Sequence, residues 1–185
     1  MDLSSLKESL SAEEQRARAE EMGRLLDQTV SATRRISADL RPLMLDDLGL
    51  ADAASWLVED FAKRSGIECR MQTSGIEDLA EASKSVAITV YRAIQESLTN
   101  IARHSGATSA WVLLAVEDRS IFVEVEDNGR GITPEAMAKS RSLGLKGMRE
   151  RITYLGGSLE IALAPRGGTR LRVRVPLRGL QEAAA

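Results

Sequence analysis

The sequence predicts an α+β fold: a two-layer α/β sandwich in which helices cover one face of a mixed β-sheet, preceded by a helical segment. Short runs of alternating apolar and polar residues predict strands, and runs with helical periodicity lie between them. The first 40 residues differ, because they are rich in Ala, Glu, Arg and Leu with one glycine and no proline. We therefore expect a helical segment at 1–42, a linker and first helix at 43–66, a sheet-bearing core at 67–178 and a tail at 179–185.

Composition limits the classes of protein and partner. A chain of 185 residues with 43% hydrophobic content suits one domain plus an appendage. The net charge of -2, from 25 basic and 27 acidic residues, gives no electrostatic reason to expect nucleic-acid or membrane binding. One cysteine, Cys69, excludes an intrachain disulfide and suits a reducing compartment. The sequence has no signal peptide, and no apolar run approaches the roughly 20 residues needed to span a bilayer. We therefore expect a cytoplasmic chain without membrane contact of its own, although a longer parent protein could be anchored in a membrane.

The N-terminal segment carries the pattern of a helical dimerisation surface. Its apolar and small residues alternate at spacings of four and three, as in a coiled-coil seam: Met22, Leu26, Thr29, Thr33, Ile36 and Leu40. Ser11 and Glu14 have the spacing of a capping box, which marks a helix start. Because one pair of helices cannot bury this seam, we expect a homodimer through a four-helix bundle. The alternative is that the helix folds onto its own domain.

The remaining elements follow in order. Pro42 ends the first helix, and residues 43–48 form an apolar connector. Helices are predicted at Leu50–Arg64, Ser83–His104 and Leu145–Leu155, and strands at Ile67–Thr73, Ser109–Glu117, Ser120–Asp127, Ser158–Ala164 and Thr169–Pro176. Asp118 and Arg119 would turn a hairpin, and Gly129–Lys146 is predicted to be a long loop. Trp56 and Trp111 are expected in the core.

Four polar or glycine-bearing segments stand out as candidate site residues. Glu96 and Asn100 lie one helical turn apart, with His104 one turn further, opposite an apolar stripe. Asp127 ends a buried strand and leads into Asn128-Gly129-Arg130-Gly131-Ile132, where backbone can approach a ligand. Gly144-Leu145-Lys146-Gly147-Met148 lies at a helix start, where free N–H groups favour phosphate. Gly167-Gly168-Thr169 opens the last strand.

The order of these four segments resembles the ATP-binding domain of sensor histidine kinases, in the Bergerat (GHKL) ATPase superfamily, and within it the nitrate/nitrite-sensor-like subfamily. Residues 96–104 resemble the N box, 127–132 the first glycine box, 144–151 the second, and 167–169 the last. Leu40-Arg41-Pro42 and Leu48-Gly49-Leu50 resemble the link between dimerisation helices and the ATPase domain. The likeness covers roughly 31–177, and it implies a Bergerat fold, ATP and Mg²⁺ as ligands, and a response regulator receiver domain as partner.

The resemblance also implies a role for each matched position. Asn100 would hold Mg²⁺, and Glu96 beside it would polarise water or the metal shell. Asp127 would accept a hydrogen bond from the adenine amine, with Thr169 backing it through a hydroxyl or water. The remaining nucleotide-binding residues would be Arg103, His104, Gly129, Gly131, Ile132, Gly144, Leu145, Lys146, Gly147 and Met148.

One departure from the resemblance concerns the phosphoryl acceptor. Histidine kinases phosphorylate a histidine on the first dimerisation helix, whereas the one histidine here, His104, lies in the N-box segment. The hypotheses are a fragment that begins after the acceptor histidine, a natural protein that phosphorylates a partner in trans, or a GHKL module of another class. The last would be an anti-sigma-type serine kinase or a nucleotide-gated interaction domain.

Overall fold

A computed structural model describes residues 18, 21–22, 43–132 and 143–178 of the chain. The chain divides into two compact units, Met1–Leu43 and Met44–Ala185. In the first unit the described residues are helical, and Met22 of the predicted seam is exposed. The rest of the seam, the capping box, most of the loop after Ile132 and the tail lie outside the described residues, so predictions about them stay predictions.

A five-stranded mixed sheet forms the centre of the second unit, with strand order β1-β2-β3-β5-β4. The strands are β1 (Glu68–Ser74), β2 (Ser109–Glu117), β3 (Ser120–Asp127), β4 (Ser158–Leu163) and β5 (Thr169–Pro176). β1 pairs with β2 in parallel, and every other pair is antiparallel. The predicted order of the strands and main helices along the chain and the mixed character of the sheet are confirmed, and β2, β3 and β5 begin and end at the predicted residues.

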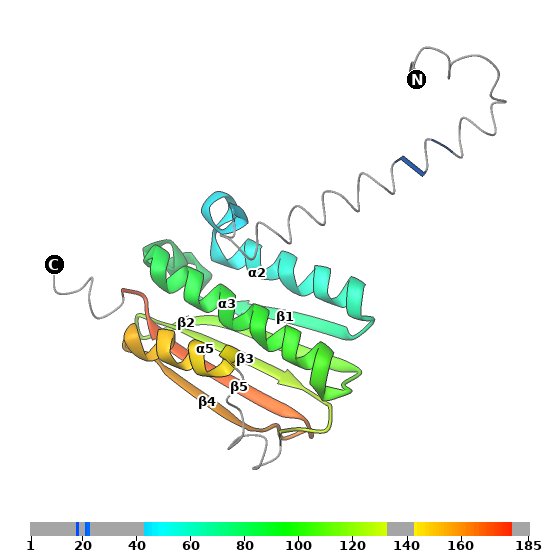
Figure 1. The fold of residues 1–185 in the computed structure, drawn as a ribbon. Helices are drawn as coiled ribbons and strands as arrows, with labels where there is room; N and C mark the ends of the chain where they lie inside the picture. Colours follow the sequence, from blue (N-terminus) through cyan, green and yellow to red (C-terminus); the bar gives the residue numbers. More distant parts are fainter. Residues whose placement is uncertain (1–17, 19–20, 23–42, 133–142, 179–185) are drawn as a thin grey trace, which may run out of the picture. The chain divides into compact units, whose positions relative to one another are not determined.

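Helices lie on one face of this sheet, which confirms the two-layer sandwich (Figure 1). They are α2 (Leu43–Ser65), α3 (Lys84–Asn100) and α5 (Leu143–Tyr154), with a 3-10 turn, η2 (Ile76–Glu81), before α3 and a π-helical turn, η3 (Ile101–Ser105), after it. Ser83 caps α3, where its side chain accepts a hydrogen bond from the Val86 N–H. No helix within the described ranges is long and apolar enough to cross a membrane.

The start of α2 differs from the prediction. Residues 43–48 were expected to be a connector, but they are helical, and Gly49 (φ 79°, ψ 174°) separates this turn from the predicted helix. Such dihedral angles are open almost only to glycine, so the sequence can bend here while helical residues continue on both sides. Gly66, at φ 71°, ends the helix as expected.

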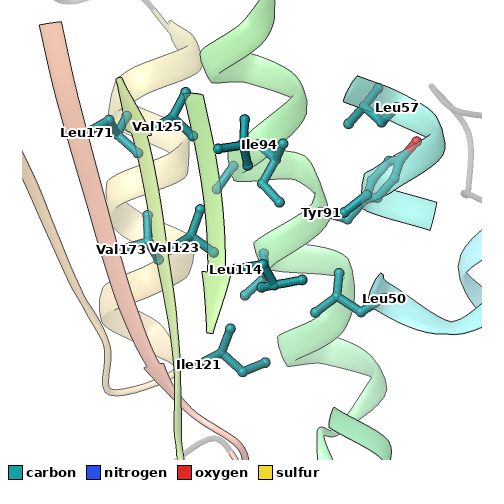
Figure 2. Close-up of a cluster of buried hydrophobic side chains, with 14 of the residues drawn as sticks. Leu50, Leu57, Tyr91, Ile94, Leu114, Ile121, Val123, Val125, Leu171 and Val173 are labelled. Carbon is teal, nitrogen blue, oxygen red and sulfur yellow. The ribbon is translucent and has the colours of Figure 1, made fainter. Parts of the chain in front are cut away.

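The core lies between the sheet and the helices. The predicted apolar stripe, which runs along α3 into the first residue of η3, is buried along its whole length: Val86, Val90, Ile94, Leu98 and Ile101. Figure 2 shows Ile94 between α3 and the sheet, and Tyr91 of α3 beside Leu57 of α2. Tyr91 is 1% exposed, and burial raises the pKa of its hydroxyl because the phenolate would lose its hydration.

The outer face of the sheet holds Trp111, contrary to the prediction that it would be a core residue. Its neighbours Ala110 and Val112 are buried, and the alternation of strand side chains places Trp111 on the opposite face. There the Arg166 guanidinium carbon lies 5.1 Å from the indole centroid, in the range of a cation–π contact. Trp56 is also half-buried rather than fully enclosed.

Candidate functional site

The site is organised around Asp127, a buried carboxylate at the end of β3. Its side chain is 3% exposed. Oδ1 accepts a hydrogen bond from the Gly129 N–H at 2.7 Å, and Oδ2 accepts one from the Thr169 N–H at 3.3 Å. An ionised carboxylate offers about four lone-pair positions, so two backbone donors leave it able to accept from a ligand.

The last glycine segment is shaped by this carboxylate. Gly168 has φ 78°, and a β-carbon there would collide with the backbone carbonyl and the carboxylate of Asp127. The Thr169 contact that the structure shows is made by the backbone N–H. The expected contact through the Thr169 hydroxyl or a water stays a prediction.

The first glycine segment is tied to the end of the helical layer. Oδ1 of Asn128 accepts hydrogen bonds from the N–H groups of Thr108 (3.0 Å) and Ser109 (2.9 Å). The Arg130 N–H donates to the Ser105 carbonyl at 2.9 Å. A β-carbon on Gly129 would collide with that same carbonyl. Close packing against η3 therefore requires a glycine here, in addition to any need to admit a ligand ring.

Glu96 and Asn100 lie together on α3, as the helical spacing predicted. Both are half-buried, and Asn100 Nδ2 donates to Glu96 Oε1 at 3.4 Å. Beyond Asn100 the helix becomes the π-helical turn that carries the exposed Arg103 and His104. Because the helical period changes here, His104 does not continue the polar stripe of Glu96 and Asn100 four residues further on. Such π-type turns are frequent at functional sites.

The second glycine segment begins α5, and Gly144 in its first turn packs against α3. A β-carbon on Gly144 would collide with Oε1 of Glu96. The start of α5, with its unpaired backbone N–H groups, therefore lies beside the Glu96–Asn100 pair. Lys146 is exposed and forms an i,i+4 ion pair with Glu150 at 3.8 Å, which contributes little in water and leaves its ammonium available.

Two residues of this segment have side chains that contact the hydrophobic core, and their part in nucleotide binding stays a prediction. Met148 is 1% exposed and belongs to the hydrophobic core, and Leu145 packs against that core. Met148 and Ile152 are four residues apart, which defines the apolar face of α5. Met148 is thus enclosed in the core, whereas Leu145 is only half-buried.

Gly131 and Ile132 end the described part of the first glycine segment, and both are half-buried. Gly131 has φ 75°, and a β-carbon there would lie 2.9 Å from Leu163 Cδ2 and 3.1 Å from the Gly168 carbonyl oxygen. The first segment thus contacts the end of β4 as well as the last glycine segment.

Together these contacts join all four predicted segments into one site. Asp127 connects the first and last glycine segments through Thr169. Ser105 connects the first glycine segment to the end of the N box, and Glu96 connects the N box to the second glycine segment. Asn128 and Gly168 lie within the predicted glycine segments, but no individual role was predicted for them. Ser105 and Leu163 were not predicted as members of the site, and no pattern in the sequence indicates them.

The donor set fits a metal held jointly with a ligand. Across the described parts of the chain, no group of three or more His, Cys, Asp or Glu could hold a metal ion. Glu96 and Asn100 nevertheless offer carboxylate and amide oxygens side by side. Mg²⁺ takes oxygen ligands and is commonly bound by one or two side chains together with substrate phosphates.

Comparison with known proteins identifies the class. Residues 85–179, about half of the chain, match the family of histidine kinase-, DNA gyrase B- and HSP90-like ATPases. The chain belongs to this family. Within it, the resemblance to the C-terminal ATP-binding domain of histidine kinases is confirmed by curated relatives that are sensor histidine kinases.

Two such relatives and one solved structure illustrate the match. The chain is 37% identical to the sensor histidine kinase MctS of Rhizobium johnstonii over 153 residues, which is 82% of this chain and 32% of MctS. It is 33% identical to the sensor histidine kinase LiaS of Bacillus subtilis over 144 residues, 78% of this chain and 39% of LiaS. The ATP-binding domain of PrrB from Mycobacterium tuberculosis superposes with a TM-score of 0.54 at 21% identity, covering 68% of this chain and 91% of that domain. The chain thus spans less than half of the length of these two curated relatives.

Proposed function

We propose that this chain binds Mg²⁺-ATP and acts as the catalytic domain of a sensor histidine kinase. It would transfer the γ-phosphoryl group to a histidine absent from the chain, for onward transfer to a response regulator receiver domain. One observation carries the proposal. Four segments far apart in the sequence meet around a buried carboxylate and around the Glu–Asn pair of α3, which lies beside the start of α5.

Asp127 is the residue proposed to recognise the base. A carboxylate accepts hydrogen bonds and cannot donate them when ionised, so it selects a purine that carries an exocyclic amine. The Gly129 and Thr169 N–H groups hold the carboxylate in position before a ligand arrives. This preorganisation reduces the ordering cost of binding.

Asn100 and Glu96 are proposed to organise the metal and the reacting phosphates. With Nδ2 of Asn100 directed at Glu96, the amide oxygen is the atom left to coordinate Mg²⁺. When bound, Mg²⁺ would neutralise charge on the phosphate oxygens. Glu96 beside it would orient water or the metal shell.

The start of α5 and the exposed cations would hold the phosphate chain. Helix N-termini present free N–H groups and a positive dipole end to anions. Gly144, Lys146 and Gly147 lie there, and Arg103 and His104 lie on η3. In the transfer, a ring nitrogen of the acceptor histidine forms a bond to the γ-phosphorus while the bond to the β–γ bridging oxygen breaks and ADP leaves. Such reactions depend mainly on positioning and charge neutralisation.

The acceptor and the assembly follow from the same proposal. The one histidine in the chain lies on η3 among the proposed phosphate-binding groups, so the acceptor belongs to another segment or chain. We propose a homodimer through the N-terminal segment 1–42 as the arrangement that presents it. The alternative function is a non-kinase or anti-sigma-type GHKL module, in which nucleotide binding gates an interaction.

The first test is calorimetric titration with a non-hydrolysable ATP analogue, with and without Mg²⁺. The proposal expects saturable binding that Mg²⁺ strengthens, and at least roughly tenfold weaker binding of the inosine analogue, which replaces the amine with a carbonyl and leaves a carboxylate facing an acceptor. The Asn100→Asp variant should lose more affinity for Mg²⁺-ATP than for metal-free ATP. A folded chain that binds neither nucleotide would refute the proposal.

The destination of the phosphoryl group needs a second measurement. The chain, incubated with labelled ATP and a histidine-bearing dimerisation helix, should give a product that is labile in acid and stable in alkali, as a phosphoramidate is. A product stable in acid would indicate a phosphoserine and favour the anti-sigma-type alternative. Nucleotide binding without any transfer would favour the interaction module.

A further inference from the structure

Leu163, the last residue of β4, is a leucine left exposed beside the site. It is 66% exposed, although Leu159 on the same strand is buried and Ile161 packs against the core. Strand side chains two residues apart lie on one face, so Leu163 is on the helix-covered face of the sheet. An exposed leucine alone means little, because much of any protein surface is apolar. Its position is what distinguishes it.

The strand register places Leu163 in one row with Asp127. Leu163 is the direct partner of Thr169 across β4 and β5. Glu126 is the partner of Arg170 across β3 and β5, which sets Asp127 level with Thr169, and the Thr169 N–H donates to Asp127 Oδ2. The residues two positions along the strand from the members belong to or pack against the core: Val125 before Asp127, Ile161 before Leu163 and Leu171 after Thr169. All three members of the row therefore face the helical layer.

Leu163 is also held against the first glycine segment. Its Cδ2 would lie 2.9 Å from a β-carbon on Gly131, so the leucine side chain occupies the space beside that glycine. Two glycines, Gly131 and Gly168, therefore line the path between Leu163 and Asp127. The result is a carboxylate and an aliphatic side chain at the two ends of a row, with the small side chain of Thr169 between them and the two glycines beside it.

We propose that Leu163 forms the apolar wall against which the nucleobase packs when its amine is bound to Asp127; this inference rests on the proposed function. Small-molecule sites combine apolar lining with a few polar groups that fix orientation. Neighbouring strands are about 4.8 Å apart, so the two spacings from β3 across β5 to β4 separate the ends of the row by roughly 10 Å. A purine ring system covers such a span. Asp127 supplies the polar contact and Leu163 the apolar surface, which becomes buried on binding.

The test compares nucleotide with a ligand that has no base. Titrations of ADP and of inorganic tripolyphosphate would be made with the wild type, Leu163→Ala and Leu163→Met. Loss of the apolar contact in Leu163→Ala should weaken the binding of ADP roughly fivefold to tenfold. Methionine has a similar volume, so the affinity of Leu163→Met for ADP should stay within about twofold of the wild type. Tripolyphosphate should bind all three alike. Leu48→Ala, which truncates a leucine 53% exposed on α2, is the matched control and should leave ADP binding unchanged.

The outcomes separate this inference from the proposed function. ADP binding that is equal in the wild type and Leu163→Ala would overturn the role of Leu163 and leave the nucleotide site standing. Equal losses for ADP and tripolyphosphate in Leu163→Ala would also overturn it, because they would indicate a general disturbance of the site. A folded wild type that binds no nucleotide would remove the proposed function and this inference together.

Discussion

The carboxylate of Glu96 on α3 occupies the space that a β-carbon on Gly144 of α5 would need. The two residues are 48 positions apart and belong to different sequence motifs. Gly144 therefore leaves room for the Glu96 carboxylate where one motif packs against the other, and a larger residue would displace that carboxylate. The contact also sets the start of α5 beside the Glu96–Asn100 pair.

Two glycine substitutions should differ in their effect on stability. In Gly144→Ala the new β-carbon meets the end of a flexible side chain, and alanine favours helix by up to about 1 kcal/mol, so the free energy of unfolding should change little. In Gly168→Ala it meets the Asp127 backbone at φ 78°, which should cost about 2 kcal/mol or more. Urea denaturation measures both. Equal losses of unfolding free energy in the two variants would show that the Glu96 carboxylate cannot move aside. If it does move aside, Gly144→Ala should keep its stability but transfer the phosphoryl group more slowly, because Glu96 is displaced.

Asp127→Asn should destabilise the fold as well as weaken nucleotide binding. Asparagine can accept from the Gly129 N–H or the Thr169 N–H through its one oxygen, and its amide group would then face the other donor. A buried donor left without an acceptor costs about 1–3 kcal/mol. Thermal unfolding without ligand measures this, with the exposed Glu68→Gln as the control for loss of a surface charge. If Asp127→Asn unfolds at the wild-type temperature, the two backbone contacts contribute little.

Arg119→Gly should stabilise the β2–β3 hairpin. Asp118 and Arg119 form its turn with φ of 48° and 56°, a conformation in which glycine avoids the cost of about 1–2 kcal/mol that L-residues bear. The ion pair of Arg119 with Glu81 is exposed and its loss costs under about 1 kcal/mol. Arg119→Ala is the matched control, since it loses the same ion pair and keeps the strained turn. The glycine variant should melt above the alanine variant, and the reverse order would contradict the account of the turn.

Cys69 should make stability fall at alkaline pH. Burial raises the pKa of its thiol from 9.0 to about 11, a rise partly offset by a backbone hydrogen bond from Arg70. Because the folded pKa lies above the unfolded value, this stabilisation is complete below pH 9 and is lost as pH rises through about 11. Denaturation of the wild type and of Cys69→Ser should therefore show a difference that shrinks between these pH values. A constant difference would mean that the thiol titrates normally in the folded protein.

Periodicity predicted the sheet and its helices well because each strand or helix must turn its apolar side to one core. The apolar stripe of α3 and the hairpin around Asp118 are confirmed on this ground. Periodicity failed for residues 43–48 and for Trp111. In the first case a single glycine lets helix continue through an expected connector, and in the second an aromatic side chain lies on the outer face under an arginine.

For the site, the sequence determined which residue types were present and in what order: an acid at a strand end, a Glu–Asn pair on a helix and three glycine segments. These features are local, since they depend on the backbone conformation at a few residues and on the spacing of residues along one helix. Only the tertiary structure decided that Thr169 reaches Asp127 through its backbone, that Met148 belongs to the core, and that Leu163 stands in line with Asp127. These relationships depend on strand register and on the packing of α5 against α3, and residues brought together by the fold leave no fixed spacing in the chain.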